Sequence, residues 1–60
     1  MKYSRNTFGD AIWFLFANDI YVVKQIYGMY CVHPSLPLKT GDEVVEYAIE
    51  KGFSNAETSK

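Results

Sequence analysis

Residues 20–32 read IYVVKQIYGMYCV, and this stretch decides the fold of the chain. It is rich in β-branched and aromatic residues, which favour a strand because their side chains pack well on a pleated surface. Thirteen residues are many for one strand, so we expect a strand or a β-hairpin, with Gly28 supplying the turn or a bulge. The alternative is a helix capped by Asn18, which would make the chain an all-α three-helix domain.

A helix is predicted before this stretch, over residues 7–17. Either Asn6 or Thr7 is expected to cap it. Trp13 and Phe14 lie off the predicted buried face, so the helix should be covered on more than one side. The apolar stripe that defines this face has the spacing i, i+3, i+4, i+7, i+8 and consists of Phe8, Ala11, Ile12, Leu15 and Phe16.

A second helix, over residues 41–51, has the clearest signal in the sequence. Thr40 and Glu43 have the spacing of a capping box, in which each side chain bonds to the backbone of the other residue. Gly52 is expected to end the helix, because glycine readily adopts the left-handed conformation found there. Its predicted buried stripe consists of Val44, Val45, Ala48 and Ile49.

The remaining segments complete one small α+β domain in residues 1–53. Two prolines make residues 33–37 an extended connector, since each removes a backbone donor and holds the preceding residue out of the helical region. Phe53 should fold back on the second helix, and residues 54–60, which follow it, are predicted to be a polar tail. The expected order is therefore a helix, a strand or hairpin, and a helix.

Size and composition indicate a cytoplasmic protein. A chain of 60 residues buries only about 60% of its unfolded surface, so its stability is marginal without a partner. Cys31 is the single cysteine, which excludes an internal disulfide and favours a reducing compartment. The longest apolar run, at residues 11–17, is far short of the ~20 residues that cross a bilayer, so we expect no membrane contact.

No set of residues predicts an enzyme, a metal site or a cofactor. Cys31 and His33 are the only soft metal ligands, whereas a structural zinc site needs about four. As a nucleophile and base, this pair lacks a third orienting group and oxyanion donors. We therefore expect a binding protein.

The net charge of −1 disfavours general binding of nucleic acid. The charge is uneven, because residues 1–39 hold four basic and two acidic residues while residues 40–60 hold five acidic and two basic ones. A small nucleic-acid-binding domain is the alternative function, pairing phosphate contacts with base stacking. Its contact residues would be Lys2, Arg5, Lys24 and Lys39, with Tyr3, Tyr21 and Tyr27 between them.

Aromatic residues make up 17% of the chain, more than so small an interior should hold. Several rings are therefore expected on the surface, where tryptophan and tyrosine carry much of the energy of protein contacts. The alternative is that all of them crowd into one large core. The residues predicted to bind the partner are Trp13, Phe14, Tyr21, Tyr27 and Tyr30.

An acidic stripe on the second helix is predicted to assist the contact, although a solvated helix face is the simpler interpretation. The expected function is a small regulator or inhibitor that covers the surface of another protein, in the manner of an antitoxin or a phage accessory protein. Self-association as a homodimer would also relieve the marginal stability. The stripe consists of Glu43, Glu46 and Glu50.

Overall fold

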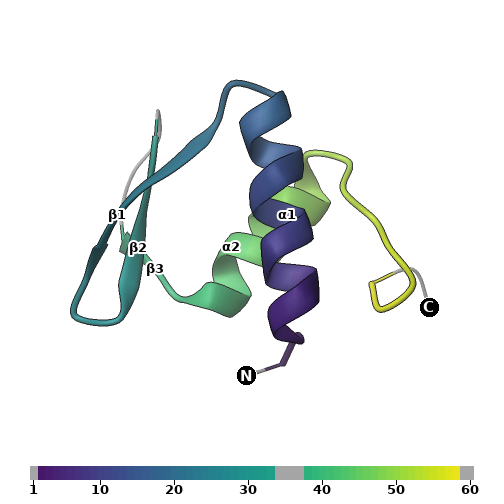
Figure 1. Ribbon diagram of the computed structural model, residues 1–60, viewed down its shortest axis with the longest axis horizontal. Helices are drawn as coiled ribbons and strands as arrows, with labels where there is room; N and C mark the ends of the chain where they lie inside the picture. The colour runs from purple at the N-terminus through teal and green to yellow at the C-terminus, as the bar shows by residue number, and fades with distance from the viewer. Residues whose placement is uncertain (1, 34–37, 59–60) are drawn as a thin grey trace.

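The computed structural model describes residues 2–33 and 38–58, and it has two helices packed on a three-stranded antiparallel sheet (Figure 1). The predicted α+β class is confirmed, and the all-α alternative is not supported. The predicted connector is wrong at His33, which pairs with Tyr21 and ends β2, and the rest of it, residues 34–37, lies outside the described residues. The elements in chain order are α1 (Arg5–Ala17), β1 (Tyr21–Ile26), β2 (Met29–His33), β3 (Leu38–Lys39) and α2 (Gly41–Glu50).

The decisive stretch forms a tight β-hairpin. Ile26 pairs with Met29, so Tyr27 and Gly28 alone make the turn. Both have positive φ angles, 53° and 76°, which is the pattern of a type I′ turn and matches the twist of the flanking strands. The turn predicted at Gly28 is confirmed, and Tyr27 accepts a left-handed conformation that is uncommon outside glycine, asparagine and aspartate.

The sheet has the strand order β1-β2-β3 and two features that the sequence did not predict. A bulge interrupts the pairing of β1 and β2 between Val22 and Lys24. The short strand β3 pairs with β2 through Tyr30 opposite Lys39 and Cys31 opposite Leu38. Because β3 has only two residues, it carries no alternating pattern that sequence reasoning could detect.

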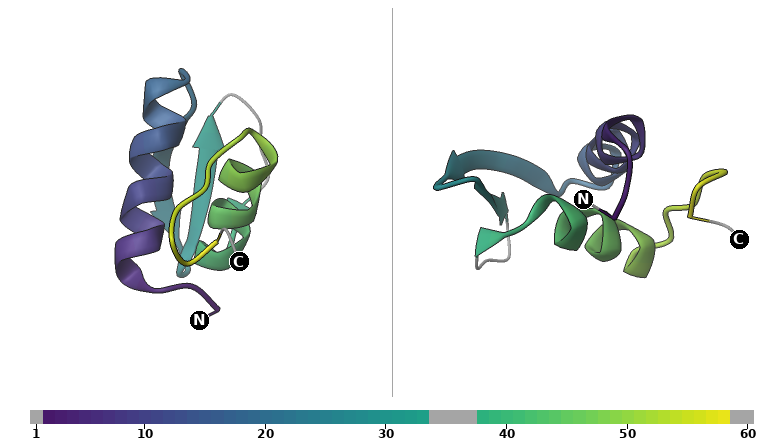
Figure 2. Two further views of the ribbon diagram at one scale, coloured as in Figure 1. Left: turned by 90° about the vertical axis from the view of Figure 1, so that its right-hand side faces the viewer. Right: turned by 90° about the horizontal axis from the view of Figure 1, so that it is seen from below.

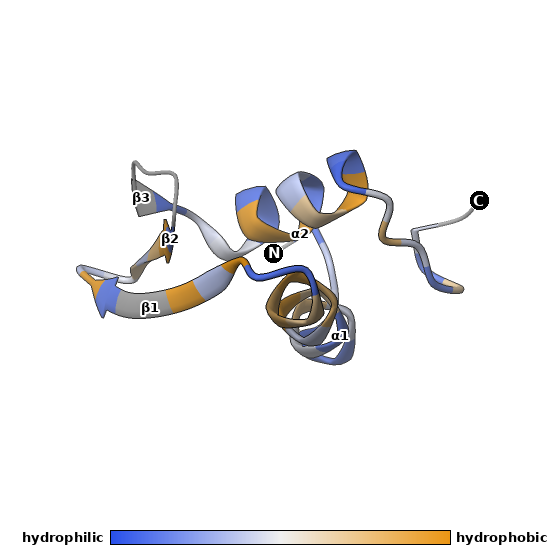
Figure 3. Cartoon of the chain, turned by 90° about the horizontal axis from the view of Figure 1, so that it is seen from above, coloured by the Kyte–Doolittle hydropathy of each residue, from blue (hydrophilic) through white to orange (hydrophobic). Residues whose placement is uncertain are grey.

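The described residues form three layers, with both helices between the sheet and the C-terminal segment (Figures 1 and 2). Figure 3 shows the hydrophobic side of α2 turned toward α1, with its hydrophilic residues on the other side. The core lies where the helices meet each other and β2. It is built of six aliphatic residues and one aromatic residue, namely Ala11, Leu15, Val32, Val44, Val45, Ala48 and Phe53.

Phe53 is the one aromatic residue buried in this core. It folds back on α2 as predicted, and its amide donates to the Ala48 carbonyl over 2.9 Å. The Phe14 ring packs on it with the ring centroids 5.7 Å apart. The interior is thus filled by aliphatic residues, and the other aromatic rings lie at its margin or beyond it.

The predicted buried face of α1 is wrong at Phe16, whose side chain is 55% exposed. The fully buried positions are instead centred on Thr7, Ala11 and Leu15. The reason is that α2 and Phe53 pack against α1 from one side and draw Phe14 inward, which turns Phe16 outward. The helix also begins at Arg5, two residues earlier than predicted, and its N-cap is Ser4, whereas the expected caps Asn6 and Thr7 lie inside the helix.

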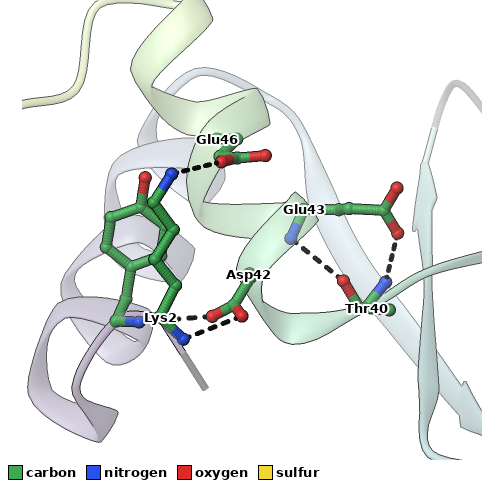
Figure 4. A network of polar contacts seen from close by, with 6 residues as sticks. Lys2, Thr40, Asp42, Glu43 and Glu46 are labelled. Carbon is green, nitrogen blue, oxygen red and sulfur yellow. Dashed lines mark hydrogen bonds and ion pairs between the residues drawn. The ribbon is translucent and has the colours of Figure 1, made fainter.

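The capping box of α2 is present as predicted (Figure 4). The Glu43 amide donates to Thr40 Oγ1 over 3.2 Å, and the Thr40 amide donates to Glu43 Oε1 over 2.9 Å. The helix ends at Glu50, one residue before the predicted end, and Gly52 follows with a φ of 114°. Its local sequence therefore sets both of its ends.

The C-terminal segment is hydrogen-bonded to the start of α1. The Ser4 amide donates to Glu57 Oε1 over 3.0 Å, and Asn55 Nδ2 donates to the buried Thr7 Oγ1 over 3.1 Å. The first turn of α1 has no acidic residue of its own, so Glu57 supplies the negative charge that favours a helix N-terminus. The segment predicted as a polar tail is polar, and it also anchors this helix.

Candidate protein-contact site

A groove lies between α1 and β1 and has a volume of about 330 Å³. Its position follows from the local structure, because the chain turns at Asn18 and Asp19 and brings the first residues of β1 back beside the last turns of α1. Ile20 secures this turn by donating its amide to the Leu15 carbonyl over 2.9 Å. The residues that line the groove are Ile12, Trp13, Phe16, Tyr21 and Val22.

An aromatic row of Trp13, Phe16, Tyr21 and His33 runs along this groove and across three elements. Trp13 meets Phe16 edge-on, with centroids 6.0 Å apart and planes at 90°. Phe16 meets Tyr21 at 5.3 Å, and Tyr21 stacks on His33 at 6.4 Å with an interplanar angle of 14°. These distances lie in the range of favourable ring contacts, so the row is held in place by its own members.

The row is well exposed where it lies on α1. Trp13 is 72% exposed and Phe16 is 55% exposed. The groove is lined by no acidic or basic residue, so burial of apolar area is the main way in which this surface can gain free energy on contact. Adjacent exposed rings beside a hollow are typical of a contact site for a macromolecule.

The structure distributes the five predicted aromatic residues over three places. Trp13 and Tyr21 line the groove. Phe14 and Tyr30 pack against the core, on Phe53 and on Phe8 respectively. Tyr27 is 97% exposed at the hairpin turn and does not line the groove, so it stands as an isolated ring.

Sequence reasoning missed three groove or row residues besides Phe16, namely Ile12, Val22 and His33. Ile12 and Phe16 were assigned to the buried stripe, since helical spacing alone does not show which edge of a broad apolar face is covered. The available signal was the excess of apolar residues around this helix. Val22 and His33 have no local signature of a site, and only strand pairing brings His33 opposite Tyr21.

The acidic stripe lies on α2, where basic residues surround it. Its three glutamates line a second hollow of about 180 Å³ together with Lys39 and Tyr47. Lys2 Nζ lies 3.1 Å from Glu46 Oε2, and the ammonium groups of Lys39 and Lys51 lie 5.3 and 5.4 Å from the Tyr47 ring centroid. Glu43 also serves the capping box, so the stripe is engaged in structural contacts.

The start of α2 holds the N-terminal residues in place (Figure 4). The Lys2 and Tyr3 amides donate to the Asp42 carboxylate over 2.9 and 3.3 Å, and these bonds, the Lys2 one foremost, lower the Asp42 pKa. The Thr40 amide likewise lowers the Glu43 pKa, and the hydrogen bond to Glu46 raises the Lys2 pKa. These shifts come from bonds that hold the fold together.

Cys31 and His33 both belong to β2, two residues apart and therefore on the same face of the strand. The His33 ring is stacked on Tyr21. Within residues 2–33 and 38–58, no three potential metal ligands come together. Across the same residues, no helix has the length and apolarity that a bilayer crossing requires.

No family model matches the chain, and neither a curated protein nor a solved structure shows a significant match to it.

Proposed function

We propose that this protein is a small protein-binding regulator or inhibitor that uses the groove and the aromatic row to cover the surface of another protein. The observation that carries the proposal is the 72% exposure of Trp13 beside the groove. A tryptophan side chain that is mostly exposed to solvent does not gain the free energy that its burial would supply. A partner that covers it recovers this free energy.

The position of the rings supports a role in contact over a role in folding. The core is complete without Trp13 and Phe16, because the buried residues of both helices and β2 contact one another directly. The row is also ordered before any partner arrives, since each ring rests on the next. Rigid rings lose little conformational freedom on binding, which favours affinity.

The proposal places the protein in the cytoplasm, with a mode of action like that of antitoxins and phage accessory proteins. Its single cysteine fits a reducing compartment. Its size fits proteins that act by obstructing another surface, because a contact of about 800 Å² on each partner would take about a fifth of its 4103 Å² surface.

The nucleic-acid alternative is less well supported. Lys2 is paired with Glu46, and Lys39 belongs to the hollow lined by the acidic stripe, so neither adds to a separate basic face. A salt titration distinguishes the two functions. Affinity for DNA or RNA that falls steeply with added salt would favour the alternative.

The direct test starts with a photo-crosslinking amino acid in place of the exposed Ala17, one helical turn from Trp13, followed by identification and purification of the protein it captures. The purified pair should bind, and Trp13→Ala should weaken binding by about 30-fold or more, as expected for a central aromatic anchor. The matched control is Tyr27→Asn, which removes an exposed ring outside the groove. Equal affinity of Trp13→Ala and the unaltered chain would overturn the proposal.

A further inference from the structure

We propose that the groove is occupied by a second copy of this chain, with Trp13 of each copy entering the groove of the other. This inference rests on the proposed function in that both need the groove as a contact surface, so a second copy and a partner protein would compete for it. It follows from the shape of the groove, its lack of charge, and the area of the rings.

The shape of the surface suits contact between identical copies. A two-fold symmetric interface brings one patch against itself, so that patch must contain both a projection and a recess. Here the exposed Trp13 ring is the projection, and the groove beside it is the recess. Its volume of about 330 Å³ lies at the lower end of the range of small-molecule sites, about 300–1,000 Å³, which leaves room for an aromatic side chain.

The electrostatics of the groove also suit a second copy. Self-contact places like charges near one another whenever the patch carries charge of one sign, which opposes the dimer. The groove is lined by two aliphatic residues, one phenylalanine, one tryptophan and one tyrosine, and none of these is acidic or basic at physiological pH. The acidic stripe, by contrast, would meet itself as glutamate against glutamate.

The area available fits a small dimer interface. Aromatic residues bury about 150–250 Å² each, so the exposed parts of Trp13 and Phe16 amount to roughly 300 Å² on each copy. A standard interface covers about 800 Å² on each side, and weaker ones cover less than about 600 Å². Two rings thus supply a third or more of the required area, and the partly exposed lining residues add to it.

The edges of the sheet are less suitable for self-association than the groove. β1 lies at one edge, but it carries the bulge between Val22 and Lys24, and a bulge hinders pairing with another strand. β3 lies at the other edge and has only two residues. Contact through side chains in the groove is therefore favoured over extension of the sheet.

Sedimentation velocity and light scattering between about 1 μM and 1 mM test the inference on the unaltered chain. The molar mass should rise from 6.9 kDa to twice that value with concentration. Trp13 is the only tryptophan, so its emission should shift to the blue and its quenching by acrylamide should fall over the same range. A mass that stays at 6.9 kDa up to 1 mM would overturn the inference, whatever happens to any variant.

Two variants locate the interface. Trp13→Ala should weaken the dimer by about 30-fold or more, whereas Tyr27→Asn should leave it unchanged, because Tyr27 lies outside the groove. A Trp13→Ala chain that stays folded and dimerises like the unaltered chain would overturn the inference. The proposed function has a separate test. If the unaltered chain dimerises through Trp13, but this residue contributes nothing to the binding of any other purified protein, the dimer is supported and the proposed function is overturned.

Discussion

The two helices pack on one core, but they differ in how many of their apolar residues are buried. In α2 the buried positions are Val44, Val45 and Ala48, and the outward side carries the acidic stripe. In α1 the buried positions are Thr7, Ala11 and Leu15, and the outward side still carries large rings. Because the core is complete without these rings, the surplus apolar surface of α1 is what marks the contact site.

The helices differ at their starts as well. The first turn of α2 is stabilised by neighbours in sequence, through the capping box. The first turn of α1 combines the local cap Ser4 with Asn55 and Glu57, which come from the far end of the chain. The start of α2 is therefore specified by its local sequence, whereas α1 depends on tertiary contacts both at its first turn and for the position of its buried face.

The largest expected effect comes from Leu15→Ala on the buried side of α1. Leu15 is fully buried, so its truncation should lower the free energy of unfolding by about 3 kcal/mol through lost burial and the cavity left behind. Urea unfolding followed by circular dichroism measures this value. The neighbouring Phe16→Ala is the matched control and should cost under about 1 kcal/mol; equal losses would show that the two sides of α1 do not differ.

Removal of residues 54–60 should have the next largest effect, about 1–2 kcal/mol. The truncated chain loses the Glu57 bond to the Ser4 amide and the Asn55 bond to the buried Thr7 hydroxyl. Amide hydrogen exchange should become faster in the first turn of α1 and stay unchanged in the first turn of α2. Removal of residues 59–60 alone is the control, and unchanged exchange in α1 after the longer truncation would contradict the anchoring role.

Thr40→Ala should destabilise the fold by about 1 kcal/mol, the usual loss for an N-cap, and should affect α2 first. Thr40→Ser keeps the hydroxyl that accepts from the Glu43 amide and should retain most of the stability. Thermal unfolding of the two variants makes the comparison. Identical midpoints would mean that packing, and not the capping box, determines where α2 begins.

The same difference between the helices explains what the sequence could predict. α2 and its cap were predictable because the Thr40 and Glu43 spacing, the apolar stripe and Gly52 all act within a few residues of one another. The hairpin was predictable from its residue types and Gly28. Where Phe14 and Phe16 point was not predictable, because that depends on the contact with Phe53, far away in sequence.

The candidate site was predictable in kind and only partly in its members. The excess of rings indicated an exposed aromatic surface, and Trp13 and Tyr21 do line the groove. Phe14 and Tyr30 instead pack at the margin of the core, on the rings of Phe53 and Phe8. The place of His33 in the row depends on the register of β1 and β2, which residue types alone do not determine.

Acid should lower the free energy of unfolding through the carboxylates at the start of α2, by less than Thr40→Ala does. The Asp42 and Glu43 pKa values are lower in the folded chain than their ordinary values of 3.8 and 4.5, so their contribution to stability is full above those values. It is then lost as the pH falls through the lowered values. Urea unfolding between pH 7 and 2.5 measures this slope. Asp42→Asn should flatten it, and an unchanged slope would exclude Asp42 as a source.

The smallest effect on stability is expected for Trp13→Ala, within about 0.5 kcal/mol, because its side chain is 72% exposed. The same change should have the largest effect on any contact made through the groove. Trp13→Ala should therefore affect binding strongly and folding little, whereas Leu15→Ala should affect folding strongly. Thermal unfolding at a low, monomeric concentration measures the stability term alone. A loss near 3 kcal/mol at that concentration would mean that Trp13 supports the fold of the single chain. The difference between the two sides of α1 would then disappear, and the exposed rings could no longer be explained by contact with another molecule.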